Sequence, residues 1–182
     1  MVMENMGKKQ ILRVLKALDG VLRNELKIIL CGSASGILTQ NLDRRTGDID
    51  ILSSIPRLSE IGPELHKIAE RYQLSDHWIN DASKGFMDFL PDDFKKRLIE
   101  IKAGFKRIKV YSISKVDFFI MKLASFRDQD LQDISGIELS KNELKILDRT
   151  ILEISKFNAK QAHKMQLFIE ECGWGRHNEF RR

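Results

Sequence analysis

Two aspartates one residue apart, Asp48 and Asp50, carry the clearest chemical signal in the sequence. They lie in "TGDIDIL", where polar and apolar residues alternate as in a strand, and residues two apart on a strand share a face. Two carboxylates this close raise each other's pKa unless a cation neutralises them. Mg²⁺ binds a few carboxylate oxygens together with substrate phosphate oxygens, so the pair predicts a metal site for phosphoryl chemistry. Alone, the same pair is more typical of an exposed acidic edge strand.

A turn of small residues precedes the aspartates, in "CGSAS" from Cys31 onward. Gly32 permits a sharp change of chain direction, and Ser33 adds a hydroxyl and an amide. The helix expected after them begins with unpaired N–H groups, which favour a phosphate. A glycine-serine pair also begins many ordinary helices. Directly before the acidic strand, it favours one shared site for a triphosphate and its metal ion.

A third set of charged residues follows later, in the helical pattern "FFIMKLASFRDQDLQD". Lys122 lies inside an apolar run, which indicates a functional placement, although its long stem could also carry the charge to solvent. Arg127, Asp130 and Asp133 follow it on what we expect to be the same helix. The two acids are expected to orient Lys122 and Arg127, or to form the weak ion pairs of an ordinary helix surface.

The stretch "CGSAS…RRTGDIDIL" resembles the nucleotidyltransferase superfamily of the DNA polymerase β type. Its signature is a hydrophobic residue and Gly-Gly or Gly-Ser, then Asp-x-Asp or Asp-x-Glu on the next strand. More narrowly, "WINDASKGF" and "DFFIMKLASFRDQDLQDI" are similar to small bacterial proteins related to the AbiEii abortive-infection toxins. The resemblance spans residues 28–135 and leaves the last helices unexplained.

The resemblance implies a Mg²⁺-dependent transfer of a nucleoside monophosphate from a nucleoside triphosphate, such as ATP, to an acceptor hydroxyl, with release of pyrophosphate. It implies Asp48 and Asp50 as metal ligands. The acceptor would be RNA, for example tRNA, or a protein, and a toxin role would add a cognate antitoxin as partner. The residues implied for binding the nucleotide or steadying its loop are Gly32, Ser33, Arg45, Thr46, Lys122 and Arg127, and Lys122 would also serve catalysis.

Many members of that superfamily have a third carboxylate as general base or metal ligand. Glu100, in "RLIEI", is the first candidate here and an ordinary exposed strand residue is the alternative. Asp81 is the second candidate, with a helix cap as its alternative. If neither reaches the metal, the fold could persist as a non-catalytic interaction module or an RNA-binding module.

Composition sets wider limits. The chain has 182 residues, 42% of them hydrophobic and 31% charged, which fits one compact unit with a real core. The net charge of +5 is compatible with a nucleic acid but does not require one. We expect no membrane segment, and a cytoplasmic protein with reduced thiols at Cys31 and Cys172.

The hydrophobic pattern predicts an α+β fold, with a small mixed sheet flanked by helices and a helical C-terminal part. We expect residues 1–135 to form a nucleotidyltransferase-like core, and 136–182 to add helices and a flexible tail to the same unit. Ser114 with Asp117, and Ser140 with Glu143, are predicted helix caps. The expected elements are helices at 9–25, 33–41, 58–73 (Pro63 in its first turn), from 114 onward through Lys122, at 140–156 and at 158–172, strands at 27–32 and 48–54, a loop over 74–96, and a hairpin of 97–102 with 107–112 around Gly104.

Overall fold

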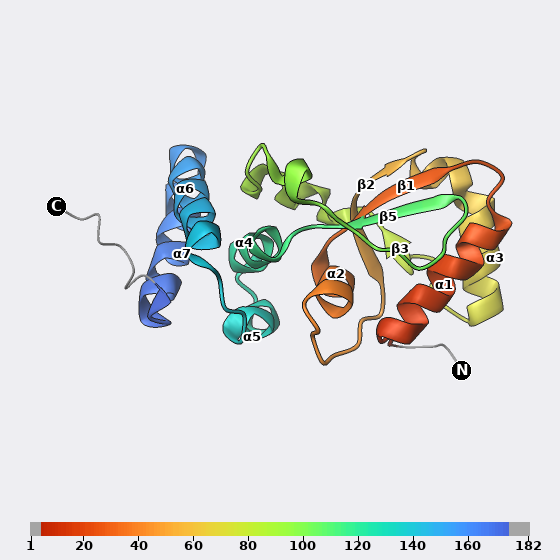
Figure 1. Cartoon of the computed structure of the whole chain (residues 1–182), viewed down its shortest axis with the longest axis horizontal. Helices are drawn as coiled ribbons and strands as arrows, with labels where there is room; N and C mark the ends of the chain where they lie inside the picture. Colours follow the sequence, from red (N-terminus) through yellow and green to blue (C-terminus); the bar gives the residue numbers. More distant parts are fainter. Residues whose placement is uncertain (1–4, 175–182) are drawn as a thin grey trace.

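A computed structural model describes residues 5–174 and shows an open five-stranded mixed sheet with helices packed around it (Figure 1). The strand order is β3-β2-β1-β5-β4. The central strand β1 (Leu26–Leu30) pairs antiparallel with β2 (Ile49–Ile55) and parallel with β5 (Ile108–Ser112). The predicted α+β class is thereby confirmed.

Two helices cover the sheet at one end of the molecule, α1 (Lys8–Val21) and α3 (Gly62–Tyr72). The apolar residues Ile11, Leu15 and Leu18 recur at helical spacing and are fully buried in this first core. Helix α1 ends at Val21, earlier than expected. Helix α3 has its proline in the first turn as predicted, behind a 3₁₀ turn at Leu58–Ile61.

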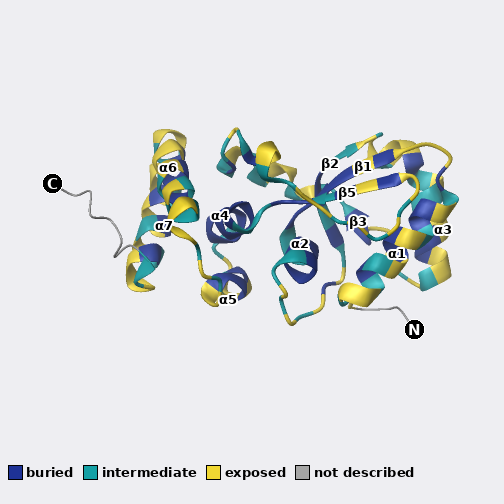
Figure 2. Cartoon of the chain, in the orientation of Figure 1, coloured by how far each residue is buried: buried dark blue, intermediate teal, exposed yellow. Residues whose placement is uncertain are grey.

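Helix α4 (Lys115–Ser125) is almost wholly buried and links the sheet to the C-terminal helices. Its N-cap is Ser114, whose hydroxyl accepts the Asp117 N–H at 3.3 Å, as the sequence predicts. The second core gathers around α4 from α6 (Lys141–Phe157) and α7 (Ala159–Glu171). In Figure 2, α4 is dark blue between the sheet and these helices, so it is the centre of the long molecule.

The loop expected over residues 74–96 is instead partly ordered into regular structure. Strand β3 (Ile79–Asn80) pairs parallel with β2, and two 3₁₀ helices follow, Ala82–Phe89 and Phe94–Arg97. Trp78 anchors this segment, because its ring is fully buried and its indole N–H donates to the Leu65 carbonyl at 3.2 Å. These contacts are distant in sequence, so local pattern could not reveal them.

The single helix expected to carry Lys122 and both downstream acids is broken into two. Helix α4 ends at Ser125, Phe126 adopts a left-handed conformation with φ 55°, and α5 (Asp128–Ser135) begins after Arg127. The chain therefore folds back, and α5 packs beside α4. This reversal decides where the two acids lie.

The predicted hairpin is present, with β4 (Ile99–Glu100) antiparallel to β5 and Gly104 at φ 66° between them. Buried Asp19 of α1 fixes this turn, since its carboxylate accepts the N–H groups of Lys106, Arg107 and Ile108. Ser140 and Glu143 form the predicted capping box. At α4 the Ser114 hydroxyl caps the helix as predicted, but the Asp117 carboxylate binds that hydroxyl and Arg97 instead of the Ser114 N–H. Both cysteines are free thiols. Among residues 5–174, no helix is long and apolar enough to cross a bilayer.

Candidate active site

Asp48 directly precedes β2, and Asp50, the second residue of β2, lines a pocket together with Lys122 of α4. The amide of Asn80, on the neighbouring strand β3, donates to Asp48 Oδ2 at 3.1 Å, and Asn80 is the register partner of Asp50. The Thr46 hydroxyl lies 3.3 Å from Asp48 Oδ1 and 3.1 Å from the Asp48 carbonyl oxygen. An amide thus holds the carboxylate of Asp48, and a threonine holds the loop that carries this residue.

The electrostatics of the pair favour a cation. Burial raises the pKa of Asp50 above its usual value, and the charge of Asp48 raises that pKa further. Hydrogen bonds from Ser83 and Asn80 and the charge of Lys122 lower it, but they do not offset the rise. Burial and the neighbouring carboxylate therefore disfavour the ionised form of Asp50, which a bound cation would stabilise.

Gly32 is required where it stands, for two independent reasons. Its φ is 57°, in the left-handed region that favours glycine, and a Cβ there would lie 2.6 Å from Asp50 Oδ2. The Cys31 N–H also donates to the Asp50 carbonyl oxygen at 3.0 Å. The first turn of α2 (Gly32–Thr39) consequently rests directly on the Asp50 residue.

A pocket opens beside this contact, between the start of α2 and the end of α4. Because α2 begins at Gly32, its first N–H groups lie at this wall, where they favour an anion. Asp50 and Lys122 both line this pocket, which therefore offers a ligand for a cation and a donor for an anionic group. The pocket is lined by Gly32, Ser33, Asp50, Ser83, Phe86, Phe118, Met121, Lys122, Ser125, Arg127 and Asp130.

Lys122 is buried but fully paired. Its ammonium forms ion pairs with Asp130 and, at 2.8 Å, with Asp133 Oδ2. Burial would raise the pKa of Asp133, but Lys122 and Arg44 together hold it below its usual value. Arg44 binds both Asp133 oxygens, at 2.9 and 2.8 Å. Lys122 is therefore fixed at the pocket by two acids, one of which is itself held by an arginine.

The other residues expected at the site are divided. Gly32, Ser33, Lys122 and Arg127 line the pocket, whereas Arg45 is exposed and lines a different pocket with Lys8. The Thr46 hydroxyl contacts Asp48, but Thr46 does not line the pocket.

The structure does not bring a third carboxylate to the pair. Glu100 lies on β4, which β5 and β1 separate from β2, and its carboxylate is exposed, 3.9 Å from the Lys102 ammonium. Asp81 is ion-paired with Lys84. In the described part of the chain, no group of three His, Cys, Asp or Glu side chains could hold a metal ion. The polar group beside the aspartates is the Asn80 amide.

Three residues of the site were not foreseen from the sequence: Arg44, Asn80 and Ser83. Asn80 and Ser83 belong to "WINDASKGF", the segment that begins at Trp78. Pairing of β3 with β2 brings this segment to the site. Arg44 is next to Arg45, and nothing local distinguishes the arginine that reaches α5 from the one that does not.

A protein family described as "nucleotidyltransferase of unknown function" (DUF6036) matches residues 9–179. The chain belongs to this nucleotidyltransferase family. The match includes α6 and α7, which the resemblance in the sequence had left unexplained. No curated protein and no solved structure is significantly similar to the chain.

The aspartates of this nucleotidyltransferase-family protein fit a divalent cation by their chemistry. Asp50 lies in a pocket where burial and the charge of Asp48 disfavour its ionised form, and Asp48 places a second hard oxygen ligand beside it. Mg²⁺ is commonly held by one or two carboxylates, with waters and substrate phosphates as its remaining ligands. Two carboxylates next to a phosphate-sized pocket therefore suffice, without a third protein ligand.

Proposed function

We propose that the protein transfers a nucleoside monophosphate from a nucleoside triphosphate to an acceptor hydroxyl, with Mg²⁺ held by Asp48 and Asp50. One observation carries the proposal: Asp50, the start of α2 and Lys122 line the same pocket. Membership of a nucleotidyltransferase family supports it. Bound Mg²⁺ would supply charge neutralisation on the transferred phosphoryl group.

The protein's own groups then have distinct tasks. The N–H groups at Gly32 and Ser33 would bind phosphate oxygens, aided by the dipole of α2. Lys122 would neutralise a phosphate facing the pocket, and its two aspartate partners keep its ammonium in place. Positioning and electrostatic stabilisation of this kind account for most of the catalysis of phosphoryl transfer.

The test is transfer of label from α-labelled nucleoside triphosphates by the purified protein, with Mg²⁺ or with a chelator. Candidate acceptors are tRNA, a protein and the protein itself. We expect Mg²⁺-dependent labelling that Asp48→Asn and Asp50→Asn each abolish. The matched control is Asp92→Asn, an exposed acid of the 90–93 turn, which should retain wild-type labelling. Wild-type protein that neither transfers label nor binds triphosphate with Mg²⁺ would overturn the proposal.

The lack of a third carboxylate among residues 5–174 favours a second candidate, a non-catalytic module that retains the fold. It predicts that the double aspartate variant keeps every cellular effect of the protein. We further propose, from the resemblance to AbiEii-like proteins, that the activity is toxic and restrained by an antitoxin. Growth arrest on expression, lost with Asp50→Asn, would support the toxin role, and growth arrest that persists in Asp50→Asn would support the non-catalytic module.

A further inference from the structure

The exposed face of α1 is basic along its whole length. Lys9, Arg13, Lys16 and Gly20 follow one another at spacings of four, three and four residues, which places them on one stripe of the helix. All four are exposed, and the only acid of the helix, Asp19, is buried and bound to backbone N–H groups. The stripe spans about 17 Å at 1.5 Å per residue. We call these residues, with Lys8, Arg45 and Arg71, the α1 stripe.

Most cations of this stripe form no ion pair with an acidic side chain among the described residues. Lys16 pairs with Asp19 at 3.6 Å, but among residues 5–174 no ion pair is formed by Lys8, Lys9, Arg13, Arg45 or Arg71. Lys8 and Lys9 also lie in the first turn of α1, which contains no acid, so the helix dipole opposes their charge. The charges of the stripe therefore repel one another and oppose the helix dipole in the isolated protein. A bound polyanion would offset this unfavourable electrostatic energy.

A pocket lies at each end of the stripe. At the C-terminal end, Arg13 and Arg71 lie 5.3 and 5.6 Å from the centre of the Tyr72 ring, and all three line a groove that includes Gly20. No atom lies within 4 Å of a Cβ built on Gly20, so the fold gives no steric reason for a glycine there. Arginines suit the phosphate of a nucleotide, an aromatic ring suits its base, and the bare backbone at Gly20 leaves room beside them.

At its N-terminal end the stripe reaches the active site. Lys8 lines a pocket with Arg44, Arg45 and one acid, Asp43. Main-chain hydrogen bonds join Met6 to Thr46 at 2.6 and 3.0 Å, and the Thr46 hydroxyl contacts Asp48. Figure 1 shows the start of α1 beside the connection between α2 and β2. A chain lying along α1 would thus end close to the two aspartates.

We propose that the α1 stripe binds the phosphodiester backbone of a single-stranded nucleic acid and directs one end of it to Asp48 and Asp50. A row of exposed cations, most of them without an acidic partner in the described part of the chain, matches a regularly charged polymer better than the patch of a folded acidic protein. The directing of an end to the aspartates rests on the proposed transferase function. Binding along α1 does not, because it needs neither Mg²⁺ nor a triphosphate.

The first experiment measures binding by fluorescence anisotropy, using a short labelled single-stranded RNA and a DNA of the same sequence, without Mg²⁺ or nucleotide. We expect Lys9→Ala/Arg13→Ala/Arg71→Ala to weaken binding at least tenfold. The slope of log K against log salt, between about 50 and 200 mM, should fall by about 2, because single strands contribute about 0.7 per phosphate contact. The RNA and DNA arms show which nucleic acid is preferred.

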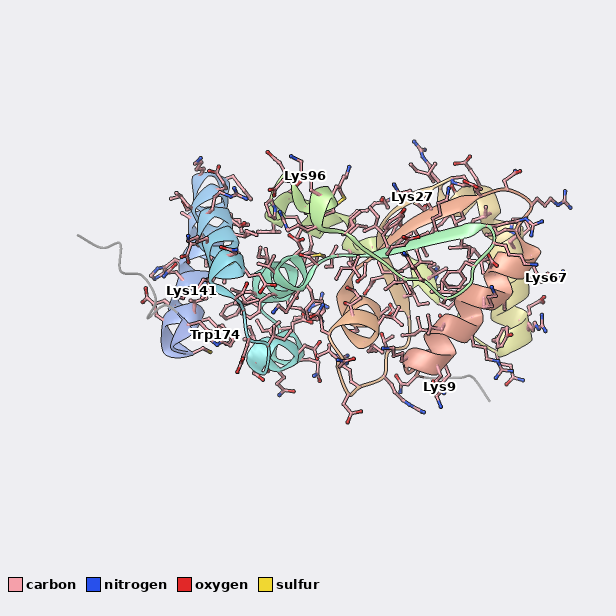
Figure 3. All side chains as sticks on the ribbon, viewed as in Figure 1. Lys9, Lys27, Lys67, Lys96, Lys141 and Trp174 are labelled. Atoms are coloured by element: carbon pink, nitrogen blue, oxygen red, sulfur yellow. The ribbon has the colours of Figure 1, made fainter. Side chains whose placement is uncertain are left out.

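The matched control removes the same charge from the opposite half of the molecule, with Lys96→Ala/Lys141→Ala/Lys160→Ala. Figure 3 shows Lys96 and Lys141 on the helical side, far along the molecule from Lys9. All three control lysines are exposed. We expect their loss to change the affinity by less than twofold and to leave the salt slope unaltered.

A second variant, Lys8→Ala/Lys9→Ala, excludes unfolding as the cause of weaker binding. It removes two cations from the positive end of α1, so it should raise the melting temperature while it lowers the affinity. A photoreactive nucleotide at the directed end should crosslink to residues 41–48, and one at the other end to α1 or α3.

Three results would overturn the inference: equal loss of affinity in the control triple, an acidic peptide of matched charge that competes as well as RNA, or both ends crosslinking to 41–48 equally. Failure of the proposed function would look different. Wild-type protein that binds through the stripe but transfers no label would leave the stripe standing. Active protein whose stripe variant binds normally would refute the stripe alone.

Discussion

Asp50 Oδ2 lies 2.6 Å from the point where a Cβ on Gly32 would be, so this carboxylate and this glycine fit against one another. The contact joins the end of α2 that we propose binds phosphate to the strand β2 that we propose holds the metal. A displacement of either element would therefore be transmitted directly to the other.

Gly32→Ala should damage both folding and activity. The left-handed φ of 57° costs an alanine about 1–2 kcal/mol, and the new methyl group would push the Asp50 side chain aside. We expect the unfolding free energy to fall by about 1–3 kcal/mol and label transfer to fall more than tenfold. Denaturant titration and the transfer assay measure these effects. Gly62→Ala, where a Cβ meets open space, is the control, and a fully active Gly32→Ala would contradict the close fit.

Asn80→Asp should make the stability of the protein depend on Mg²⁺. The change sets a third carboxylate 3.1 Å from Asp48 Oδ2 and replaces a donor by a like charge. In chelator we expect a melting temperature below that of wild type, because the repulsion is uncompensated. Added Mg²⁺ should raise the melting temperature more than it does in wild type, since binding to the folded state stabilises it. The same response to Mg²⁺ in both proteins would mean that the aspartates do not hold the metal.

Arg44→Lys tests whether the arginine positions Lys122 through Asp133. Lysine keeps the charge, but its side chain is one bond shorter than that of arginine, whose single nitrogen Nη1 holds both Asp133 oxygens at 2.9 and 2.8 Å. We expect the unfolding free energy to fall by about 1 kcal/mol and the KM for the triphosphate to rise. The neighbouring change Arg45→Lys alters an exposed arginine without an ion pair among the described residues, and it should leave the KM for the triphosphate unchanged. If Arg44→Lys leaves this KM unaltered, Arg44 only stabilises the fold.

Asp19→Asn should weaken the fold in a manner that depends on pH. Burial would raise the pKa of Asp19, but N–H donation from Arg107, Lys106 and Ile108 and the charge of Lys16 hold it below 3.8. A lowered pKa in the folded state stabilises the protein above the unfolded pKa and ceases to do so as pH falls through the folded pKa.

We therefore expect a loss of about 2 kcal/mol at neutral pH, from weakened hydrogen bonds to a charged acceptor. The difference from wild type should shrink below pH 4 and vanish at still lower pH, as followed by urea titration. Asp76→Asn, at an exposed acid paired only with His66, should show no such difference. A constant difference at every pH would indicate that the Asp19 charge is not involved.

Much of the site was encoded in short segments. Gly32 and Ser33 follow the apolar run of β1, and the alternation in "TGDIDIL" places Asp48 and Asp50 on one face of β2. Such features depend on backbone geometry over a few residues, as do the caps at Ser114 and Ser140. Local sequence could therefore predict them, together with the α+β class.

The tertiary structure alone decided what surrounds the two aspartates. Pairing of β3 with β2 brings Asn80 to them, while the strand order leaves Glu100 two strands away. The left-handed turn at Phe126 folds α5 back, so that Asp133 reaches both Lys122 and Arg44. These contacts join residues up to 89 positions apart, and they form only when packing of the whole chain fixes the order of its strands.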